Sequence, residues 1–531
     1  MTSRFLAAFA LFGLPAFASA AEKPLREIID AEIGAGWLRE KLSPAPKADD
    51  ATFLRRVAID IIGTIPTYEE TTKFLADENP HKRDDLIERL LNDPRFGTHQ
   101  ADVWDLVFFG RHPAGGDGLL KRDGFKKWLG GKFAKNEPFD KWVRDLLLAE
   151  QEGSELYLAQ FRNAPEEATV QISRLFLGMQ LQCARCHDHP FDKWTQKDFF
   201  GMAGFFVRVV VSESGAANAR KFAIGEKGFG EVLFTGAVKD QKPGQKGEPV
   251  KPKFLGGNEL QEPPVAKDAK NVQPKDGEKL PKPAFSRKEK IAAWVTAADN
   301  PYLAKAVANR VWAQFMGRGL VHPVDDIGEK NTPSNSDLLT ILGEQMKAHR
   351  FDLKWYVREL VSSHTYQLAC VGSSKNALPK YYDRARVRPL SAEEIVATFR
   401  QATLYDAGDP KTAGQGLPNS GNEYILRYFG EPTDGLGDFQ GSISEHLFLN
   451  NGNIWQMIKR KKGNLAETLA LSKDTWEQKV DKMFLTVLNR PPTAAQKTKF
   501  VKFLQSDAKS DGLIEEAIWV LLNSAEFRFN H

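Results

Sequence analysis

The sequence has 531 residues, of which 42% are apolar and 27% are charged, and this composition is typical of globular proteins. The 73 lysine and arginine residues nearly balance the 69 aspartate and glutamate residues, so the overall charge gives no reason to expect a nucleic-acid partner. Only three cysteines are present, and because three thiols form at most one disulfide, a disulfide-stabilised scaffold is excluded.

The first twenty residues have the features of a secretory signal peptide. Arg4 precedes an apolar stretch at residues 5–17, and Ala18-Ser19-Ala20 forms a cleavage site of small residues. The stretch is shorter than the roughly 20 apolar residues that a membrane span needs. We therefore expect an exported protein, periplasmic or extracellular, with no integral membrane segment once residues 1–20 are removed.

Residues 21–206 are expected to form a first helical domain. Apolar residues recur there at the three- and four-residue spacing of amphipathic helices. Thr67 is a candidate N-cap, because Glu69 and Glu70 follow it in the first turn. The expected helical segments are residues 50–62, a helix starting after Thr67, and residues 86–91, 104–109, 125–133, 139–148 and 168–182.

Residues 207–285 break this pattern. Two short β-branched or apolar stretches, residues 207–211 and 231–235, are expected to be strands. Residues 239–283 are rich in lysine, proline and glycine and contain few aromatic residues. Such a stretch buries little apolar surface, so we expect a flexible linker between two domains.

Residues 286–531 are expected to form a second helical domain. The fold class predicted for the whole chain is therefore mainly α, with two helical domains separated by a short β-containing segment and a Lys/Pro/Gly-rich linker. The expected helices are residues 300–315, 338–349, 353–362, 391–402, 475–488, 493–504 and 513–527.

The sharpest chemical signal is Cys183-Ala184-Arg185-Cys186-His187, which has the C-x-x-C-H spacing of c-type haem attachment. Two thiols three residues apart can each add to a vinyl group of haem. The adjacent His187 can then supply an axial imidazole to the iron. An exported chain suits this chemistry. The motif therefore predicts haem c held by Cys183, Cys186 and His187.

Other interpretations of the motif remain open. In an oxidising compartment Cys183 and Cys186 could form a structural disulfide. With His187 and His189 they could instead bind zinc, since cysteine and histidine are its usual ligands. A thioredoxin-like dithiol is disfavoured, because no βα context surrounds the motif.

Several polar and aromatic residues after the motif are candidate contributors. His189 could contact a haem propionate or orient Asp192, and Met202 is a candidate sixth iron ligand. Met202 could equally be a core residue, and the residues 188–196 could simply be a turn that caps the next helix. Further candidates around the motif are Asp188 and Trp194, and alternative iron ligands are His99, His112 and His364.

A second candidate constellation lies in the other half of the chain. Asp325 and Asp326 follow each other in an expected loop, and paired carboxylates can bind Ca²⁺ or act as an acid/base pair. A solvated or helix-capping pair is the simpler interpretation. No nucleophile elbow, zinc-protease motif or phosphate-binding loop is present in the sequence.

Long stretches of the sequence resemble a family of secreted planctomycete proteins of unknown function. The first part resembles their cytochrome-associated second domain, and the second part resembles the secreted domain that follows it. The matching stretches are Phe53-Leu54-Arg55-Arg56, Asp60, Gly63, Pro66-Thr67, Pro80 with Lys82-Arg83, Asn136 to Asp140, Val170 to Gly178, Cys183 to Phe206, Asn300 to Ser334, Phe351 to Lys354, Ser363 to Leu368 and Arg388 to Glu394.

The resemblance implies an architecture more than an activity. Members often accompany glycan-degrading proteins, which implies a role near extracellular polysaccharide breakdown. Many members carry a Cys-Glu-Cys-Glu-Arg stretch where this sequence has Gly435 to Phe439.

Three functions follow as hypotheses. The first is a haem-bearing electron-transfer protein with a redox or polysaccharide-processing partner. The second is a non-redox glycan- or surface-binding module with a Cys183–Cys186 disulfide or metal site. The third is a hydrolase that uses loop carboxylates.

Overall fold

The computed structural model describes residues 23–110, 122–215, 220–234, 247–265, 278, 282–375, 377–405, 455–506 and 512–531. The predicted signal peptide, His112, and residues 435–439 lie outside these ranges. Within them the chain is mainly helical, which confirms the predicted fold class, and the strands form only two-stranded sheets.

The first half of the chain is a succession of short helices. They are α1 (Leu25–Glu40), α2 (Asp50–Ile62), α3 (Tyr68–Ala76), α4 (Lys82–Leu91), α5 (Pro94–Phe109), α6 (Asp123–Ala134), α7 (Phe139–Leu148), α8 (Glu155–Ala159), α9 (Pro165–Ile172), the π-helical turn η1 (Ser173–Leu177), the 3₁₀ turn η2 (Gln182–Arg185) and α10 (Gln196–Ala203).

The second half is helical as well. Its elements are α11 (Arg287–Val295), α12 (Leu303–Met316), α13 (Ser336–Ala348), α14 (Leu353–Ser362), η4 (Pro379–Tyr381), α15 (Ala392–Thr403), α18 (Trp455–Ile458), α19 (Leu465–Leu471), α20 (Trp476–Val487), α21 (Ala494–Leu504), α22 (Gly512–Leu522) and α23 (Ala525–Arg528).

Within the described ranges the strands form three antiparallel pairs. The pair β1 (Val209–Ser214) and β2 (Lys221–Glu226) has Val211 opposite Ile224, and β3 (Val232–Phe234) pairs with β4 (Glu248–Val250). The pair β5 (Arg388–Pro389) and β6 (Phe529–Asn530) joins the end of the chain to the segment before α15. The two predicted strands overlap β1 and β3. The strand β1 begins two residues and ends three residues after its predicted bounds, and β3 begins one residue after its predicted start.

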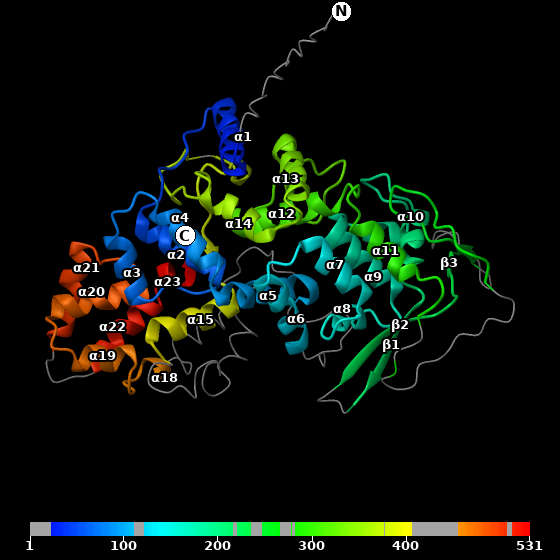
Figure 1. Cartoon of the computed structure of the whole chain (residues 1–531). Helices are drawn as coiled ribbons and strands as arrows, with labels where there is room; N and C mark the ends of the chain where they lie inside the picture. Colours follow the sequence, from blue (N-terminus) through cyan, green and yellow to red (C-terminus); the bar gives the residue numbers. More distant parts are fainter. Residues whose placement is uncertain are drawn as a thin grey trace, which may run out of the picture.

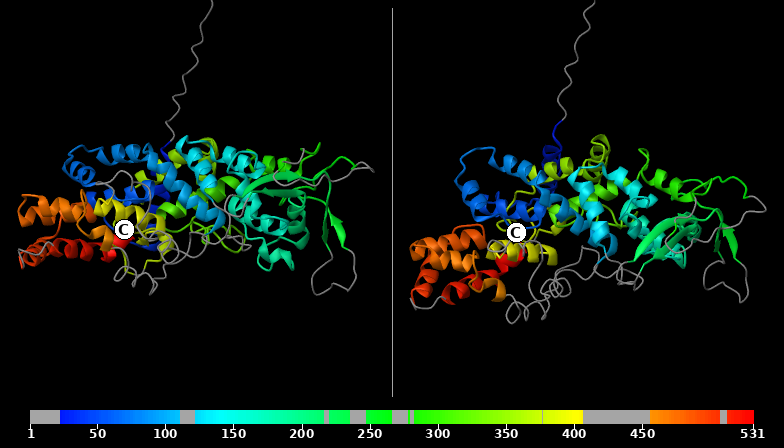
Figure 2. Two further views of the ribbon diagram at one scale, coloured as in Figure 1. Left: turned by 90° about the horizontal axis from the view of Figure 1, so that it is seen from below. Right: turned by 60° about the horizontal axis from the view of Figure 1, so that its bottom comes forward.

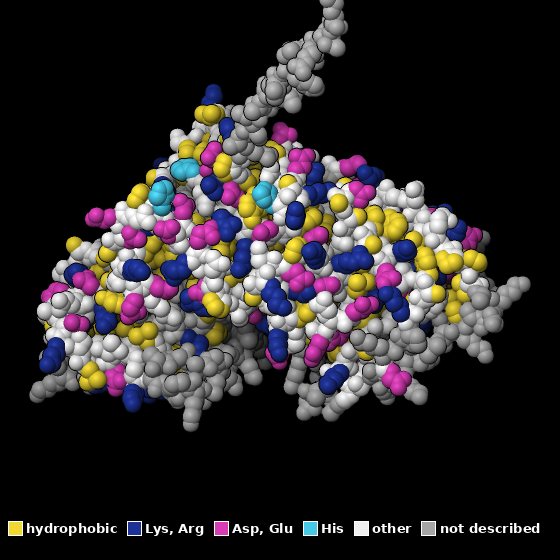
Figure 3. Space-filling model, viewed as in Figure 1, with side chains coloured by type: hydrophobic (Ala, Val, Ile, Leu, Met, Phe, Trp, Pro, Cys, Tyr) yellow, Lys and Arg dark blue, Asp and Glu magenta, His cyan; other side chains and the backbone are white. Residues whose placement is uncertain are grey.

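The molecule is elongated. The helices α18 to α22 lie at one end and the hairpin β1–β2 at the other, and the additional views agree (Figures 1 and 2). Figure 3 shows acidic and basic side chains intermingled over one face, with hydrophobic side chains gathered over the region of α10, α11 and β3. Among the described helices none is long and apolar enough to cross a membrane.

The two predicted helical domains share one hydrophobic core. This core contains buried side chains from Leu25 to Leu260 and also from Ile291 to Tyr382. The contact between α7 and α11 and that between η1 and α12 join the two segments. The predicted boundary at residues 207–285 therefore separates stretches of sequence whose side chains pack together.

A second, smaller core is formed by residues between Leu390 and Phe527 together with Ile59 and Ile65. The helix α2 contributes to both cores, since Phe53 belongs to the first. Arg55 on α2, completely buried, donates hydrogen bonds to the carbonyl oxygens of Val487 and Phe527. Because interior carbonyl groups need donors, Arg55 fastens the second core to α2.

Residues 247–265, which belong to the expected linker, pack against the helices. Residues 247–265 lie against α10, where Lys253 donates from its main chain to Gly201 O and from Nζ to Asp198 Oδ1 at 2.7 Å. Leu255 and Leu260 are buried in the first core. The two leucines and the ion pairs of Lys253 and Glu262 supply anchoring that the average composition of the stretch does not reveal.

Candidate functional site

The segment that leads to the C-x-x-C-H motif ends its helix earlier than predicted. The expected helix 168–182 stops at Gly178, which has a left-handed φ of 69°. A Cβ at this position would lie 2.8 Å from Ile327 Cδ1, so both the conformation and the space require glycine. After Gly178 the chain turns, and the 3₁₀ turn η2 presents the motif.

The two motif cysteines share one turn at the surface. Cys183 and Cys186 are both exposed free thiols, and Cys186 N donates to Cys183 O at 3.4 Å. Residues three apart lie nearly above each other in a 3₁₀ turn. Ala184 between them is completely buried and fixes the turn to the core, so both thiols are accessible from the same direction.

His187 is exposed, and its Nδ1 lies 2.8 Å from the carbonyl oxygen of Asp188. A carbonyl oxygen only accepts hydrogen bonds, so Nδ1 carries the proton in the neutral ring. This leaves Nε2 as the nitrogen that can bind a metal, and such a backbone partner orients metal-binding histidines in general.

The loop after the motif is held by its own polar groups. Asp188 Oδ1 accepts from Gln196 N at 2.9 Å, and His189 N donates to Trp194 O at 2.8 Å. One alternative predicted that His189 orients Asp192. Its Nδ1 instead accepts from Phe191 N at 3.3 Å, so this ring nitrogen does not orient Asp192.

The start of α10 is set by a capping box. Thr195 and Asp198 form this box, whereas Asp192 accepts from Lys193 N next to it. The helix accordingly begins at Gln196. Asp188 and Thr195 therefore together fix the end of the loop.

The aromatic residues that follow the motif differ in burial. Trp194 is buried, with 5% of its surface exposed, and Phe199 is completely buried in the core. Phe191, in contrast, is 62% exposed. Met202 is also completely buried in the first core. Its thioether is a core side chain, whereas His187 faces solvent, so the structure gives no support to Met202 as a sixth ligand.

A loop from the second half of the chain lies against the motif segment. Ile327 N donates to Gly178 O at 2.7 Å. Asp325, which is buried, pairs with Arg174 Nε at 3.0 Å and accepts from Gln180 Nε2 at 3.2 Å. The structure thus brings together the two regions that the sequence singled out separately.

The same loop also approaches the residues after the motif. Lys193 Nζ lies 3.7 Å from Glu329 Oε1, and Lys330 Nζ lies 5.3 Å from the ring centroid of Phe191. A Cβ added to Gly328 would come within 2.9 Å of Asp192 Oδ2. Residues 325–330 thus contact the chain on both sides of the motif, at residues 174–180 and at residues 191–193.

The two loop carboxylates are not arranged as a catalytic pair. Asp325 is committed to Arg174, while Asp326 accepts from Asn331 Nδ2 at 3.3 Å within its own loop. Asp325 was expected to be solvated, but its carboxylate is instead buried as an internal ion pair. This geometry does not favour the hydrolase hypothesis.

The other histidines considered as iron ligands lie in different surroundings. His99 is buried with Nε2 3.8 Å from Glu394 Oε1, and burial lowers its pKa while Glu394 opposes that shift. His364 is exposed, and its main-chain N–H donates to Asp30. Within the part of the chain that the structure describes, neither histidine contacts the motif.

The donor set of the motif contains the groups that covalent haem attachment uses. Within the described ranges no three histidine, cysteine or acidic side chains gather as metal ligands. Covalent haem needs only two accessible thiols and one imidazole, and Cys183, Cys186 and His187 supply these at the surface.

Sequence reasoning missed one feature. Arg56, Arg384, Arg386 and Arg388 line a pocket. The arginines at 384, 386 and 388 were a local signal, but the sequence could not show that Arg56, far away along the chain, lies beside them.

Comparison with known proteins gives two family matches. Residues 28–210 match the family PSCyt2, described as a protein of unknown function (DUF1549). Residues 287–420 match the family PSD1, described as a protein of unknown function (DUF1553). No curated protein and no solved structure matches the chain.

Proposed function

We propose that this protein is an exported haem protein that transfers electrons, with haem c attached to Cys183 and Cys186 and His187 as the axial ligand. The observation that carries this proposal is the geometry of the motif. Both thiols are exposed on one 3₁₀ turn, and the Nδ1 contact with Asp188 O leaves Nε2 of His187 for iron.

Bound haem supplies a one-electron Fe(III)/Fe(II) couple. The chain's own residues hold the attachment turn in place. Ala184 anchors it in the core, and the ion pair of Asp325 with Arg174 fixes the segment before it. An exposed attachment site keeps haem close to the surface, where a redox partner can approach.

The cellular context belongs to the same proposal. Residues 1–20 act as the signal peptide, which places the protein where haem c is attached. The resemblance to secreted planctomycete proteins, together with the PSCyt2 and PSD1 matches, supports membership of that group. A role beside extracellular polysaccharide breakdown rests on the resemblance alone.

The test is a denaturing gel stained for haem peroxidase activity. The full chain, with its signal peptide, is produced in a host that attaches haem c. Covalent haem survives denaturation, so we expect the wild type to stain and Cys183→Ala/Cys186→Ala to remain unstained. Cys370→Ala is the matched control and should stain like the wild type, because Cys370 lies outside the motif.

An unstained wild type, beside a stained reference cytochrome from the same host, would contradict haem attachment. The hypothesis of a non-redox glycan- or surface-binding module, in which Cys183 and Cys186 form a disulfide or metal site, would then take its place.

A further inference from the structure

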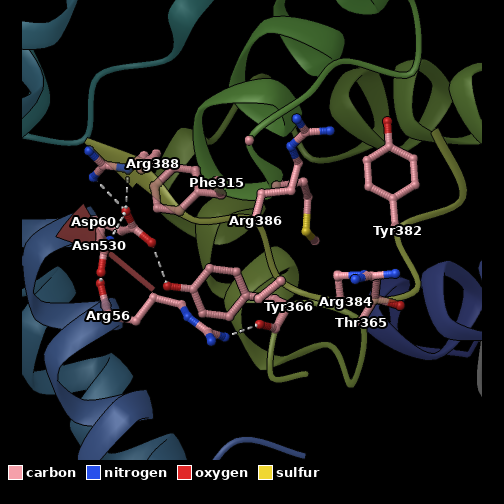
Figure 4. Close-up of a pocket in the computed structure, with 13 residues that line it drawn as sticks. Arg56, Asp60, Phe315, Thr365, Tyr366, Tyr382, Arg384, Arg386, Arg388 and Asn530 are labelled. Atoms are coloured by element: carbon pink, nitrogen blue, oxygen red, sulfur yellow. Dashed lines mark hydrogen bonds and ion pairs between the residues drawn. The ribbon is translucent and has the colours of Figure 1, made fainter. Parts of the chain in front are cut away.

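A small pocket lies where the two cores meet, away from the C-x-x-C-H motif in the sequence. It is formed by α2, the end of α12, residues 365–366 and 382–388, and β6. Figure 4 shows Arg388, Asp60, Asn530 and Arg56 on one side of it, and Tyr382 and Arg384 on the other. Four of the lining residues are arginines, and one is a carboxylate.

The single carboxylate, that of Asp60, already accepts hydrogen bonds from neighbouring side chains. Asp60 Oδ1 accepts from Arg388 Nη2 at 2.7 Å and from Asn530 Nδ2 at 2.8 Å, and its Oδ2 accepts from Tyr366 Oη at 2.7 Å. Arg388 also donates to Glu394, at 2.7 and 2.8 Å. These bonds hold one wall of the pocket rigid.

Two other arginines are fixed mainly by main-chain acceptors. Arg56 Nη1 donates to the carbonyl oxygens of Tyr366 and Leu368, at 2.7 and 2.9 Å. Arg384 Nη2 donates to Ser374 O at 2.6 Å, and its other acceptor is the neighbouring Asp383. Carbonyl acceptors do not neutralise a guanidinium group, but Asp60, Glu394 and Asp383 do offset charge. The four arginines against these three carboxylates leave one positive charge in excess.

The fourth arginine lies at the exposed mouth. Arg386 is exposed. Gly317 ends α12 with a φ of 73°, and a Cβ added to it would lie 2.9 Å from the Cβ of Arg386. The glycine therefore lets the segment of Arg386 pass close to the end of α12. Arg384, Arg386 and Arg388 alternate along this segment.

We propose that this pocket binds an oxyanion group, meaning a sulfate, phosphate or carboxylate. Guanidinium groups recognise such groups through paired, charge-assisted hydrogen bonds. The cavity volume is about 20 Å³, which is the space of one or two water-sized groups. An anionic group thus inserts one or two oxygen atoms, while the rest of its molecule stays at the mouth.

The test is a calorimetric titration of the purified full chain with sulfate, phosphate and acetate, each at constant ionic strength. We expect one saturable site for at least one of them. Sulfate and phosphate test for tetrahedral anions, and acetate tests for a carboxylate. Because each charge-assisted hydrogen bond contributes a large fraction of such binding, Arg384→Gln/Arg386→Gln should weaken the affinity about tenfold or more.

The control is Arg144→Gln, an exposed arginine on α7, which should bind like the wild type. Thermal unfolding of each variant without anion checks that the fold is retained. Equal affinity in the double variant and the control, or no saturable binding of any of the three anions to the wild type, would overturn the proposal. Neither result depends on haem attachment, so this site and the proposed function fail independently.

Discussion

At the scale of single residues, Asp105 on α5 is a buried charge with few partners. Burial raises its pKa to about 6, although Arg122 and Lys126 oppose the shift and Asp102 and Glu393 add to it. Arg122 Nη2 lies 3.1 Å from Asp105 Oδ2. This is an ion-pair distance, but the two groups are not aligned as a hydrogen bond.

The raised pKa predicts a pH-dependent stability. In the folded state Asp105 binds a proton more tightly than its ordinary pKa of 3.8 would allow. Its contribution to stability is therefore complete below about pH 4 and is lost as the pH rises through 6. A shift of about two pKa units corresponds to about 3 kcal/mol. Asp105→Asn removes this dependence.

The measurement is urea unfolding of wild type and Asp105→Asn between pH 4 and pH 7. The free energy of unfolding of the variant, relative to the wild type, should rise by up to about 3 kcal/mol over this range. Asp84→Asn, at a side chain that is 65% exposed, should show no such trend. Parallel curves for Asp105→Asn and wild type would contradict the assignment.

At the scale of elements, the helix starts and ends show what local sequence can reveal. The predicted cap at Thr67 is confirmed by a capping box with Glu70, and the helix 50–62 is confirmed to the residue by α2. The helix predicted for 168–182 was wrong at its end. Gly178 was the local signal. Its left-handed φ of 69° and the close approach of Ile327, about 150 residues later, both favour glycine there.

The contact between residues 325–330 and the motif segment gives the second stability prediction. Asp325→Ala leaves Arg174 and Gln180 without their acceptor. We expect the free energy of unfolding to fall by about 2–3 kcal/mol, since breaking a buried ion pair strands its partner. Asp326→Ala is the matched control and should cost about 1 kcal/mol or less, because it loses only the bond from Asn331.

Chemical denaturation of the two variants measures this difference. Equal losses for Asp325→Ala and Asp326→Ala would show that the ion pair with Arg174 does not hold the loop against the motif segment.

At the scale of the whole molecule, sequence predicts the fold class but not how the segments combine. Periodicity identifies helices one at a time and cannot show that Val143 and Ile291 belong to one core. For the same reason it could not place α2 between the two cores, or Arg55 against Phe527 O. The same holds for the candidate site. The sequence reveals the C-x-x-C-H motif, but it does not reveal that residues 325–330 contact the chain on both sides of it.

The measurement that tests the central claim most directly is the mass of two tryptic peptides. Trypsin cleaves after Arg174, Arg185 and Lys193, so Cys183 and Cys186 fall on the separate peptides 175–185 and 186–193. Haem bound through both thioethers joins these peptides, and the joined species should persist after reduction and alkylation, with the added mass of one haem. The peptide containing Cys370 should be alkylated in the same sample. Two separate alkylated peptides would contradict haem attachment, and peptides joined only before reduction would identify a disulfide instead.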